Sequence, residues 1–129
     1  MARTKPRPTD AELAILGVLW TQGPATVRTV HEALADARET GYTTTLKLMQ
    51  IMAEKGLVTR NESARTHVYT ASASRDDTQR QLVSHLVDRA FGGSAAALVL
   101  QALNAHPASP HELAEIQQLI KEYKEGTRR

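Results

Sequence analysis

The sequence predicts a mostly α-helical protein with one small β-hairpin, in which a front domain precedes a helical extension. Three observations lead to this prediction. Capping signals precede several stretches that have apolar residues at helical spacing. A helix with one polar face, beginning near Gly41, is followed directly by two short strand-like runs. Finally, 129 residues with 41% hydrophobic content can bury one modest core plus an appendage, but not two large domains.

Two short helices are expected before the polar-faced helix. Thr9 and Glu12 form a capping box at the start of the first one, because each side chain can satisfy the other residue's unpaired backbone N–H. This helix runs past Trp20, which we expect in the core, and ends at Gly23. Thr26 caps the second helix, which ends before a break at residues 39–41.

The polar-faced helix has two different sides. At helical spacing one side is suited to packing and the other is polar, with Thr45, Leu48, Met49 and Met52 opposite Thr43, Lys47, Gln50 and Glu54. Threonines in its first turn lie beside the unpaired N–H groups and partial positive charge of a helix N-terminus, where phosphate binds readily. We therefore expect one face to pack and the other to be free to contact nucleic acid.

A β-hairpin is expected directly after Gly56. Residues 57–60 and 66–70 are rich in β-branched and aromatic side chains. The turn between them lacks an Asn-Gly or Asp-Gly pair, which predicts a loop of several residues that carries Arg65. Three helices followed by such a hairpin form a winged helix-turn-helix domain, which we assign to residues 1–73. The alternative is that the hairpin only covers the core.

Residues 74–129 are expected to form three further helices. Capping signals at Ser74 and Ser109 begin the first and the last, the sequence FGGS at residues 91–94 interrupts them, and the middle helix runs over residues 95–104. So small a helical region seldom buries its apolar stripes alone, so we expect it to pair with a second copy of the chain. The residues predicted to form this dimer interface are Leu82, Leu86, Leu98, Val99, Leu113, Ile116, Ile120 and Tyr123.

The basic residues are concentrated in the front of the chain. The net charge is only +2, but residues 1–75 carry ten Lys/Arg against seven Asp/Glu, whereas residues 76–129 carry six against seven. Arg3, Lys5 and Arg7 form a basic N-terminal arm, and further basic side chains cluster in the polar-faced helix and hairpin, namely Lys47, Lys55, Arg60, Arg65 and His67. This distribution favours a nucleic-acid partner over the alternative of ordinary solubilising charges.

Several other functions lack the residues that they require. The absence of cysteine excludes disulfides and thiolate chemistry and agrees with a cytoplasmic location. The longest apolar run, residues 95–100, is too short to cross a bilayer, so no stable membrane association is expected. Only His106 and His111 approach a ligand-like cluster, and we expect neither a metal site nor a cofactor. No phosphate-binding loop or nucleophile elbow occurs, so no enzymatic activity is expected.

Four segments together resemble one known family. They are PTDAELAILGVLW at the start, GYTTTLKLMQ in the polar-faced helix, EKGLV before the hairpin, and FGGS before the final helices. With them, the chain resembles the BlaI/MecI penicillinase-repressor family of bacterial winged-helix regulators from Thr9 to about Tyr123. The resemblance implies a homodimer whose front domains bind a dyad-symmetric DNA operator and whose C-terminal helices interlock.

The resemblance also implies which residues touch DNA. Thr43, Thr44 and Lys47 match the family's groove and phosphate contacts, and Arg65 in the wing matches a supporting phosphate contact. With the polar face of the helix and the basic hairpin, the predicted DNA-binding residues are Thr43, Thr44, Lys47, Gln50, Arg60 and Arg65. One departure is Ile51, where relatives often have a basic residue.

A second departure concerns inactivation. In the best-known relatives a membrane sensor-protease cleaves near an Asn-Phe bond in the dimerisation region, and the corresponding bond here is Ala90-Phe91. Gly92 and Gly93 lower the cost of the extended conformation that cleavage needs. The sequence thus predicts a proteolytic switch at Ala90 and Phe91 with a sensor-protease as partner. The copper-responsive relatives use a C-terminal cysteine motif that this chain lacks.

Two other functions remain open at this point. One is a ligand- or metal-responsive winged-helix regulator, in which an effector bound between the two modules shifts the population of binding-competent dimers. The other is a protein-interaction adaptor that has kept the fold and lost DNA binding. Salt dependence distinguishes the adaptor, because DNA affinity falls steeply as salt rises.

Overall fold

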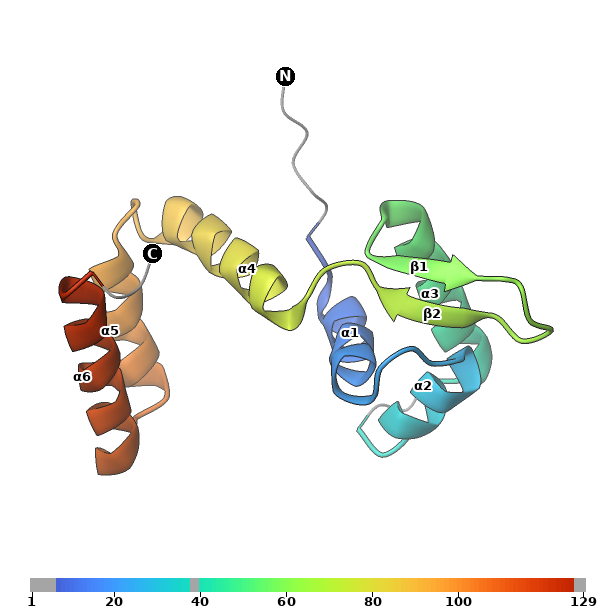
Figure 1. The fold of residues 1–129 in the computed structure, drawn as a ribbon, viewed down its shortest axis with the longest axis horizontal. Helices are drawn as coiled ribbons and strands as arrows, with labels where there is room; N and C mark the ends of the chain where they lie inside the picture. The colour runs from blue at the N-terminus through green and yellow to red at the C-terminus, as the bar shows by residue number, and fades with distance from the viewer. Residues whose placement is uncertain (1–6, 38–39, 127–129) are drawn as a thin grey trace, which may run out of the picture. The chain divides into compact units, whose positions relative to one another are not determined.

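The computed structural model describes residues 7–37 and 40–126. Arg3 and Lys5 of the predicted basic arm lie outside this part of the chain. The elements, shown in Figure 1, are α1 (Asp10–Gln22), α2 (Val27–Leu34), α3 (Tyr42–Lys55), β1 (Val58–Asn61), β2 (Val68–Ala71), α4 (Arg75–Ala90), α5 (Ala95–Ala105) and α6 (Pro110–Lys124). The prediction of a mostly helical fold with one antiparallel hairpin is confirmed.

The chain divides into two compact units, Met1–Leu82 and Val83–Arg129. The division therefore falls inside α4, later than the boundary after residue 73 that the end of the hairpin predicts. The first unit holds α1, α2, α3, the hairpin and the start of α4. The second holds the rest of α4 with α5 and α6.

The first unit surrounds one apolar core. Its largest fully buried side chains come from α1, α2, α3 and both strands, and they are Ile15, Val30, Met49, Met52, Val58 and Tyr69. Tyr69 also connects the hairpin to the chain before α2, because its backbone exchanges two hydrogen bonds of 2.8 and 3.0 Å with that of Ala25. Burial of these side chains, at about 25 cal/mol per Å² of apolar surface, is the main source of stability.

Side-chain caps begin most of the helices, as the sequence predicts. At α1 the Thr9 N–H donates to Glu12 Oε1 at 2.9 Å and the Glu12 N–H donates to Thr9 Oγ1 at 3.2 Å, which is the full capping box. At α2 only one such bond is present, from the Thr29 N–H to Thr26 Oγ1. Ser74, Ser94 and Ser109 each accept one backbone N–H at the starts of α4, α5 and α6. The cap at Ser94 was not among the predicted signals.

The strands of the hairpin begin one and two residues later than expected and end one residue later. β1 and β2 pair antiparallel from Val58 opposite Ala71 to Asn61 opposite Val68. Residues 62–67 form the loop between them, in agreement with the missing tight-turn signature. At its start the Asn61 side chain accepts the Ser63 N–H at 2.9 Å, which closes a local Asx turn.

The start of α4 is attached to α1 by polar contacts. The Trp20 indole N–H donates to the Ala73 carbonyl at 2.9 Å, and the Arg75 guanidinium lies 5.8 Å from the centre of the indole ring. Arg75 also donates to Thr21 Oγ1 at 2.9 Å, and Thr78 in the next turn is buried. Trp20 is therefore half-buried at the passage from β2 to α4, at the edge of the core and not at its centre.

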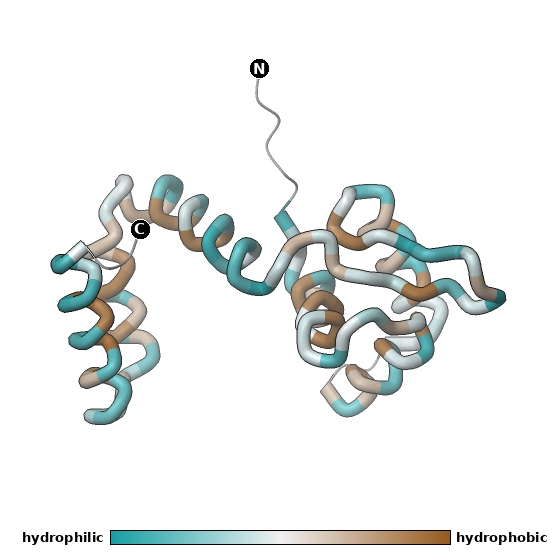
Figure 2. The backbone as a smooth tube through the Cα atoms, in the orientation of Figure 1, coloured by the Kyte–Doolittle hydropathy of each residue, from teal (hydrophilic) through white to brown (hydrophobic). Residues whose placement is uncertain are grey.

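The second unit has little buried surface within one chain. Neither α5 nor α6 contains a fully buried residue, although Figure 2 shows apolar residues recurring along both helices. Val99, which is predicted to lie in the dimer interface, is exposed in the single chain. The large exposed apolar side chains of α4, α5 and α6 are Val83, Leu86, Val99, Leu100, Leu113, Leu119, Ile120 and Tyr123.

Within the described ranges no single helix is long and apolar enough to span a bilayer, although α4 and α5, which are bent by 102° at their junction, reach that threshold as a pair.

Candidate nucleic-acid interface

The two faces of α3 have different environments, as the sequence predicts. Thr45, Met49 and Met52 are buried against α1, α2 and the hairpin. The opposite face is exposed and carries Thr43, Thr44, Lys47, Gln50 and Glu54. Ile51 is also exposed, at 37%, so an apolar side chain borders this face. The exposed face is the surface of α3 that is free to contact a partner.

The N-terminus of α3 differs from that of every other helix in the described chain. Its N-cap is Gly41, with φ −73° and ψ 162°, and no side chain caps the helix. The other helices begin with a Ser or Thr whose hydroxyl accepts a backbone N–H. The first-turn N–H groups of α3 therefore keep their capacity to bind an anion, with the helix dipole in support.

The hairpin of β1, β2 and the loop between them is the wing. The wing and the exposed face of α3 border one surface hollow of about 270 Å³. The hollow is lined by Val27, Tyr42, Leu46, Gln50, Arg60, Arg65, Thr66, His67 and Tyr69. The structure thus brings together three of the predicted site residues, Gln50, Arg60 and Arg65. The other three, Thr43, Thr44 and Lys47, are not among its lining residues and lie on the same exposed face of α3.

Arg60 is the site cation with an acidic partner. Its Nε and Nη2 atoms donate to Glu62 Oε2 at 2.7 and 2.6 Å. Tyr69, which is opposite Arg60 in the strand register, and Glu62 raise the pKa of Arg60 above its ordinary value, so this side chain is charged at every relevant pH. Glu62 was not among the predicted site residues, although its position two residues after Arg60, near the end of the strand, was a signal for it.

Arg28 is a further basic residue beside α3 and was not among the predicted site residues. Its guanidinium carbon lies 5.3 Å from the ring centre of Tyr42, the first residue of α3. The His31 ring also packs edge-on against the Tyr42 ring, with 5.8 Å between the two ring centres. No spacing rule relates residues on two helices, so only the packing of α2 on α3 brings Arg28 to the N-terminus of α3.

Lys55 does not belong to the exposed basic cluster that the sequence predicts. Its Nζ atom donates to both carboxylate oxygens of Glu12, at 2.8 and 3.0 Å, and the Glu12 side chain is only 3% exposed. Burial alone would raise the pKa of Glu12, but the Lys55 ammonium and the Thr9 N–H outweigh it and hold the pKa below its ordinary value. This cation therefore neutralises a buried charge of the fold.

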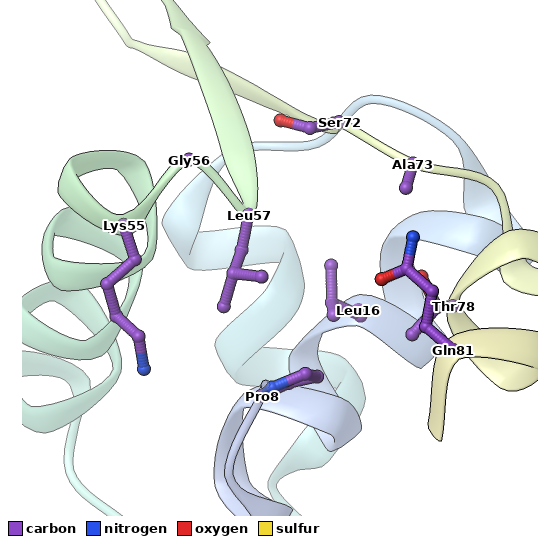
Figure 3. A pocket seen from close by; sticks show the side chains of 9 residues that line it. All are labelled: Pro8, Leu16, Lys55, Gly56, Leu57, Ser72, Ala73, Thr78 and Gln81. Carbon is purple, nitrogen blue, oxygen red and sulfur yellow. The ribbon is translucent and has the colours of Figure 1, made fainter. Parts of the chain in front are cut away.

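A small cavity of about 140 Å³ lies at the other end of the first unit, where α1 meets the hairpin and the start of α4. Figure 3 shows Leu16 and Leu57 directed into it, with the amide of Gln81 at one side. The complete lining is Pro8, Leu16, Lys55, Gly56, Leu57, Ser72, Ala73, Thr78 and Gln81. The cavity is distinct from the exposed face of α3 and has an apolar floor with a few polar groups.

The family is decided by the extent of one match. The family model of the penicillinase repressor matches residues 8–122. The chain belongs to the penicillinase repressor family. Members of this family are repressors and not enzymes, in agreement with the predicted absence of enzymatic activity.

Individual relatives agree with this assignment. This chain is 38% identical to the transcriptional regulator BlaI of Mycobacterium tuberculosis over 93 residues. The aligned residues make up 70% of this chain and 67% of the relative. This chain is 24% identical over 119 residues to the penicillinase repressor of Bacillus licheniformis, which covers 92% and 93% of the two chains. Its fold is similar to the solution structure of the DNA binding domain of the repressor BlaI, with a TM-score of 0.51 and 22% identity over 59% of this chain and 93% of that one.

The predicted proteolytic switch lies at the end of α4 in this repressor-family chain. Ala90 is the last residue of the helix, and the N–H groups of Phe91 and Gly93 both donate to the Val87 carbonyl, at 3.2 and 2.9 Å. Gly92 and Gly93 have φ of 57° and 83°, a left-handed conformation that glycine adopts readily. The bond between residues 90 and 91 is therefore held in a hydrogen-bonded helix end, and cleavage requires that this turn opens first.

His111, one of the two histidines that approach a ligand-like cluster in the sequence, lies near an acidic side chain of α6. His111 Nε2 lies 3.9 Å from Glu115 Oε2, and both side chains are well exposed. In the described ranges, no group of three or more His, Cys, Asp or Glu side chains has a geometry that could hold a metal ion.

Proposed function

We propose that this protein is a homodimeric transcriptional repressor that binds a dyad-symmetric DNA operator through α3 and the wing. The observation that carries the proposal is one surface on which the exposed polar face of α3, its uncapped N-terminus and two wing arginines occur together. A bacterial repressor that binds operator DNA acts in the cytoplasm, because the DNA is there. The family assignment and the fold support this proposal.

The site residues divide into two roles in this proposal. The major groove of B-DNA is about 12 Å wide and accepts one α-helix. Gln50 is the side chain on the exposed face suited to read a base edge, because its amide can pair with adenine in a bidentate way. Thr43, Thr44 and the open N–H groups of the first turn bind phosphate of one DNA strand. Lys47 adds a positive charge that attracts the phosphates of the same DNA strand. Arg65 contacts phosphate from the wing.

The homodimer is proposed from the apolar surface of the second unit. Tyr123 is 72% exposed and Ile120 is 53% exposed on α6, and Leu86 and Val99 are comparably open on α4 and α5. Exposed apolar side chains recurring on every helix of one unit are typical of an interface between copies. Linking two DNA-binding units makes the second contact intramolecular, which raises operator affinity without any new contact per unit.

Inactivation by cleavage at Ala90-Phe91 is the proposed release mechanism. Cutting there separates the DNA-binding unit from α5 and α6, and so removes the linkage between two half-site contacts. The test is incubation with the cognate membrane sensor-protease and mass analysis of the products. An intact chain under conditions that induce the regulated gene contradicts this mechanism.

The proposal is tested by fluorescence anisotropy on a labelled duplex from the upstream region of the protein's own gene, over a series of salt concentrations. We expect two chains per duplex and weaker binding to a scrambled duplex. Lys47→Ala is expected to make the slope of log affinity against log salt shallower by about 0.9 for each DNA-binding unit, because one phosphate contact is lost.

A matched control for this variant lies in α6. Lys121→Ala removes the same charge from the last turn of that helix and should leave the slope unchanged. Equal binding of the upstream and scrambled duplexes by the wild-type protein argues against sequence-specific repression. A slope that Lys47→Ala does not change contradicts a phosphate contact from Lys47.

The cavity of about 140 Å³ favours a second candidate, a ligand-responsive repressor. Ala73 lines the cavity and its carbonyl accepts the indole N–H of Trp20, the one tryptophan of the chain. An effector there should change tryptophan fluorescence, raise the melting temperature and weaken operator binding together. A compound that changes only one of the three readouts does not support this candidate.

A further inference from the structure

One ion pair lies within the proposed DNA-binding surface itself. Arg60 in β1 directs its Nε and Nη2 atoms to the same carboxylate oxygen of Glu62, at 2.7 and 2.6 Å. These two donors form the edge of the guanidinium that binds a carboxylate or a phosphate oxygen in bidentate contacts. One of the guanidinium edges that Arg60 would offer to DNA is therefore already occupied.

The surroundings of Arg60 set it apart from the other cations of the surface. Arg60 borders a second hollow with Gln50 and Glu54, so it lies beside the exposed face of α3. Its side chain is 32% exposed and that of Glu62 is 54% exposed, so both groups are accessible to a binding partner. Lys47 and Arg65, by contrast, take part in no ion pair within the described part of the chain.

From this geometry we infer that Glu62 competes with DNA phosphate for Arg60 and thereby lowers the sequence-independent DNA affinity of the repressor. The inference rests on the proposed DNA-binding function and concerns one residue of the same surface. Glu62 acts as an internal counter-ion, which makes Arg60 contribute little to attraction at long range.

The consequence follows from how cations bind DNA. Each Lys or Arg that neutralises a phosphate releases condensed counterions, and this release produces most of non-specific affinity and its salt dependence. An arginine whose charge is already balanced by a carboxylate releases none until that pair breaks, and the carboxylate itself repels the phosphate. Removing only the charge of Glu62 should therefore return one effective cation to each wing.

The test uses the full chain and a random-sequence duplex, so no operator needs to be known. Glu62→Gln keeps the size of the side chain and removes its charge. At about 100 mM salt we expect the variant to bind this duplex about three- to tenfold more tightly, with a log–log salt slope steeper by about 0.9 for each bound wing. Because Glu62 is more than half exposed, the melting temperature should not change.

Two further variants separate the inference from a general charge effect. Glu54→Gln removes the same charge from the hollow that Arg60 borders, but Glu54 forms no ion pair within the described residues, so its effect should be clearly smaller. In an Arg60→Gln background, the gain from Glu62→Gln should be much smaller, because the cation that it frees is gone and only the repulsion between the carboxylate and phosphate is relieved.

The outcomes are distinct. A steeper slope that requires Arg60 supports the inference. Unchanged binding by Glu62→Gln, or an equal gain in the Arg60→Gln background, overturns it while wild-type DNA binding still stands. A wild-type chain that binds neither the random duplex nor its own upstream region overturns the proposed function and the inference with it.

Discussion

The ion pair of Glu12 and Lys55 shows that a basic residue next to the proposed DNA-binding surface can serve stability instead of DNA binding. Glu12 completes the cap of α1 and is nearly fully buried, while Lys55 reaches it from the end of α3 and keeps 29% of its side chain exposed. A buried carboxylate without a partner is costly, whereas a partly exposed ammonium can still be hydrated. The two residues of this pair are therefore not equivalent, and Lys55 contributes to stability by neutralising Glu12.

We expect Lys55→Met to destabilise the protein by about 1–3 kcal/mol at pH 7, less than for a fully buried pair because Lys55 is partly exposed. The native pKa of Glu12 is lowered, so the stability from its charge is present above the ordinary pKa and lost as pH falls through the native value. The difference from wild type should therefore shrink in urea titrations below about pH 4.5. Glu12→Gln serves as the comparison and should cost less, since it leaves no buried charge.

At the scale of the element, α3 begins without a side-chain cap at the place where the proposal requires a phosphate. Gly41 has an extended conformation that any residue can adopt, and a Cβ there meets nothing within 4 Å. Gly41→Asp should cap the helix and stabilise the fold by a few tenths of a kcal/mol, roughly the usual gain over glycine. The same carboxylate should weaken DNA binding at least about tenfold, because it occupies the N–H groups and repels phosphate.

Thermal melting and anisotropy of the same variant check these two opposite effects. Gly41→Ala is the control, because it adds a side chain that can neither cap the helix nor repel an anion. It should bind DNA nearly as wild type does. Loss of binding in both variants would show that the backbone at residue 41, and not the open helix end, is what DNA binding needs.

At the scale of the whole molecule, operator affinity should depend on apolar side chains that never touch DNA. Leu86→Glu with Ile120→Glu places charges on the exposed apolar surface of α4 and α6. We expect a monomer in sedimentation experiments and about 100- to 1,000-fold weaker operator binding, while binding to a single half-site stays nearly unchanged. Gln118→Glu adds the same charge on the opposite side of α6 and should leave the dimer intact. Tight operator binding by the double variant would contradict a linked dimer.

Much of the fold was predictable because its signals are local. Thr9, Thr26 and Ser109 begin helices where the capping rules place them, and Gly56 ends α3 in the left-handed conformation that glycine allows. The exposed and buried sides of α3 follow directly from helical spacing. The order of three helices and a hairpin was sufficient to predict the winged-helix class.

The roles of individual charges were not predictable in the same way. The sequence alone does not distinguish the basic residues Lys47, Lys55 and Arg60 from one another. In the structure, however, Lys55 pairs with Glu12 and Arg60 pairs with Glu62. Glu12 and Lys55 are far apart in the sequence, and no periodicity relates them. The same holds for the hydrogen bond from Trp20 to Ala73, and for the cavity that this contact borders.

The sequence by itself determined the elements, their order and the family, because caps, glycine stops and apolar spacing act within a few residues of each other. Only the tertiary structure decided which cations remain available on the exposed face of α3 and the wing, and where the two compact units divide. It also showed that, among the helices of the described chain, α3 alone lacks a capping side chain, and that Arg28 lies beside the first residue of α3. Ion pairing and burial are set by distances in space, which packing creates between residues that the chain keeps apart.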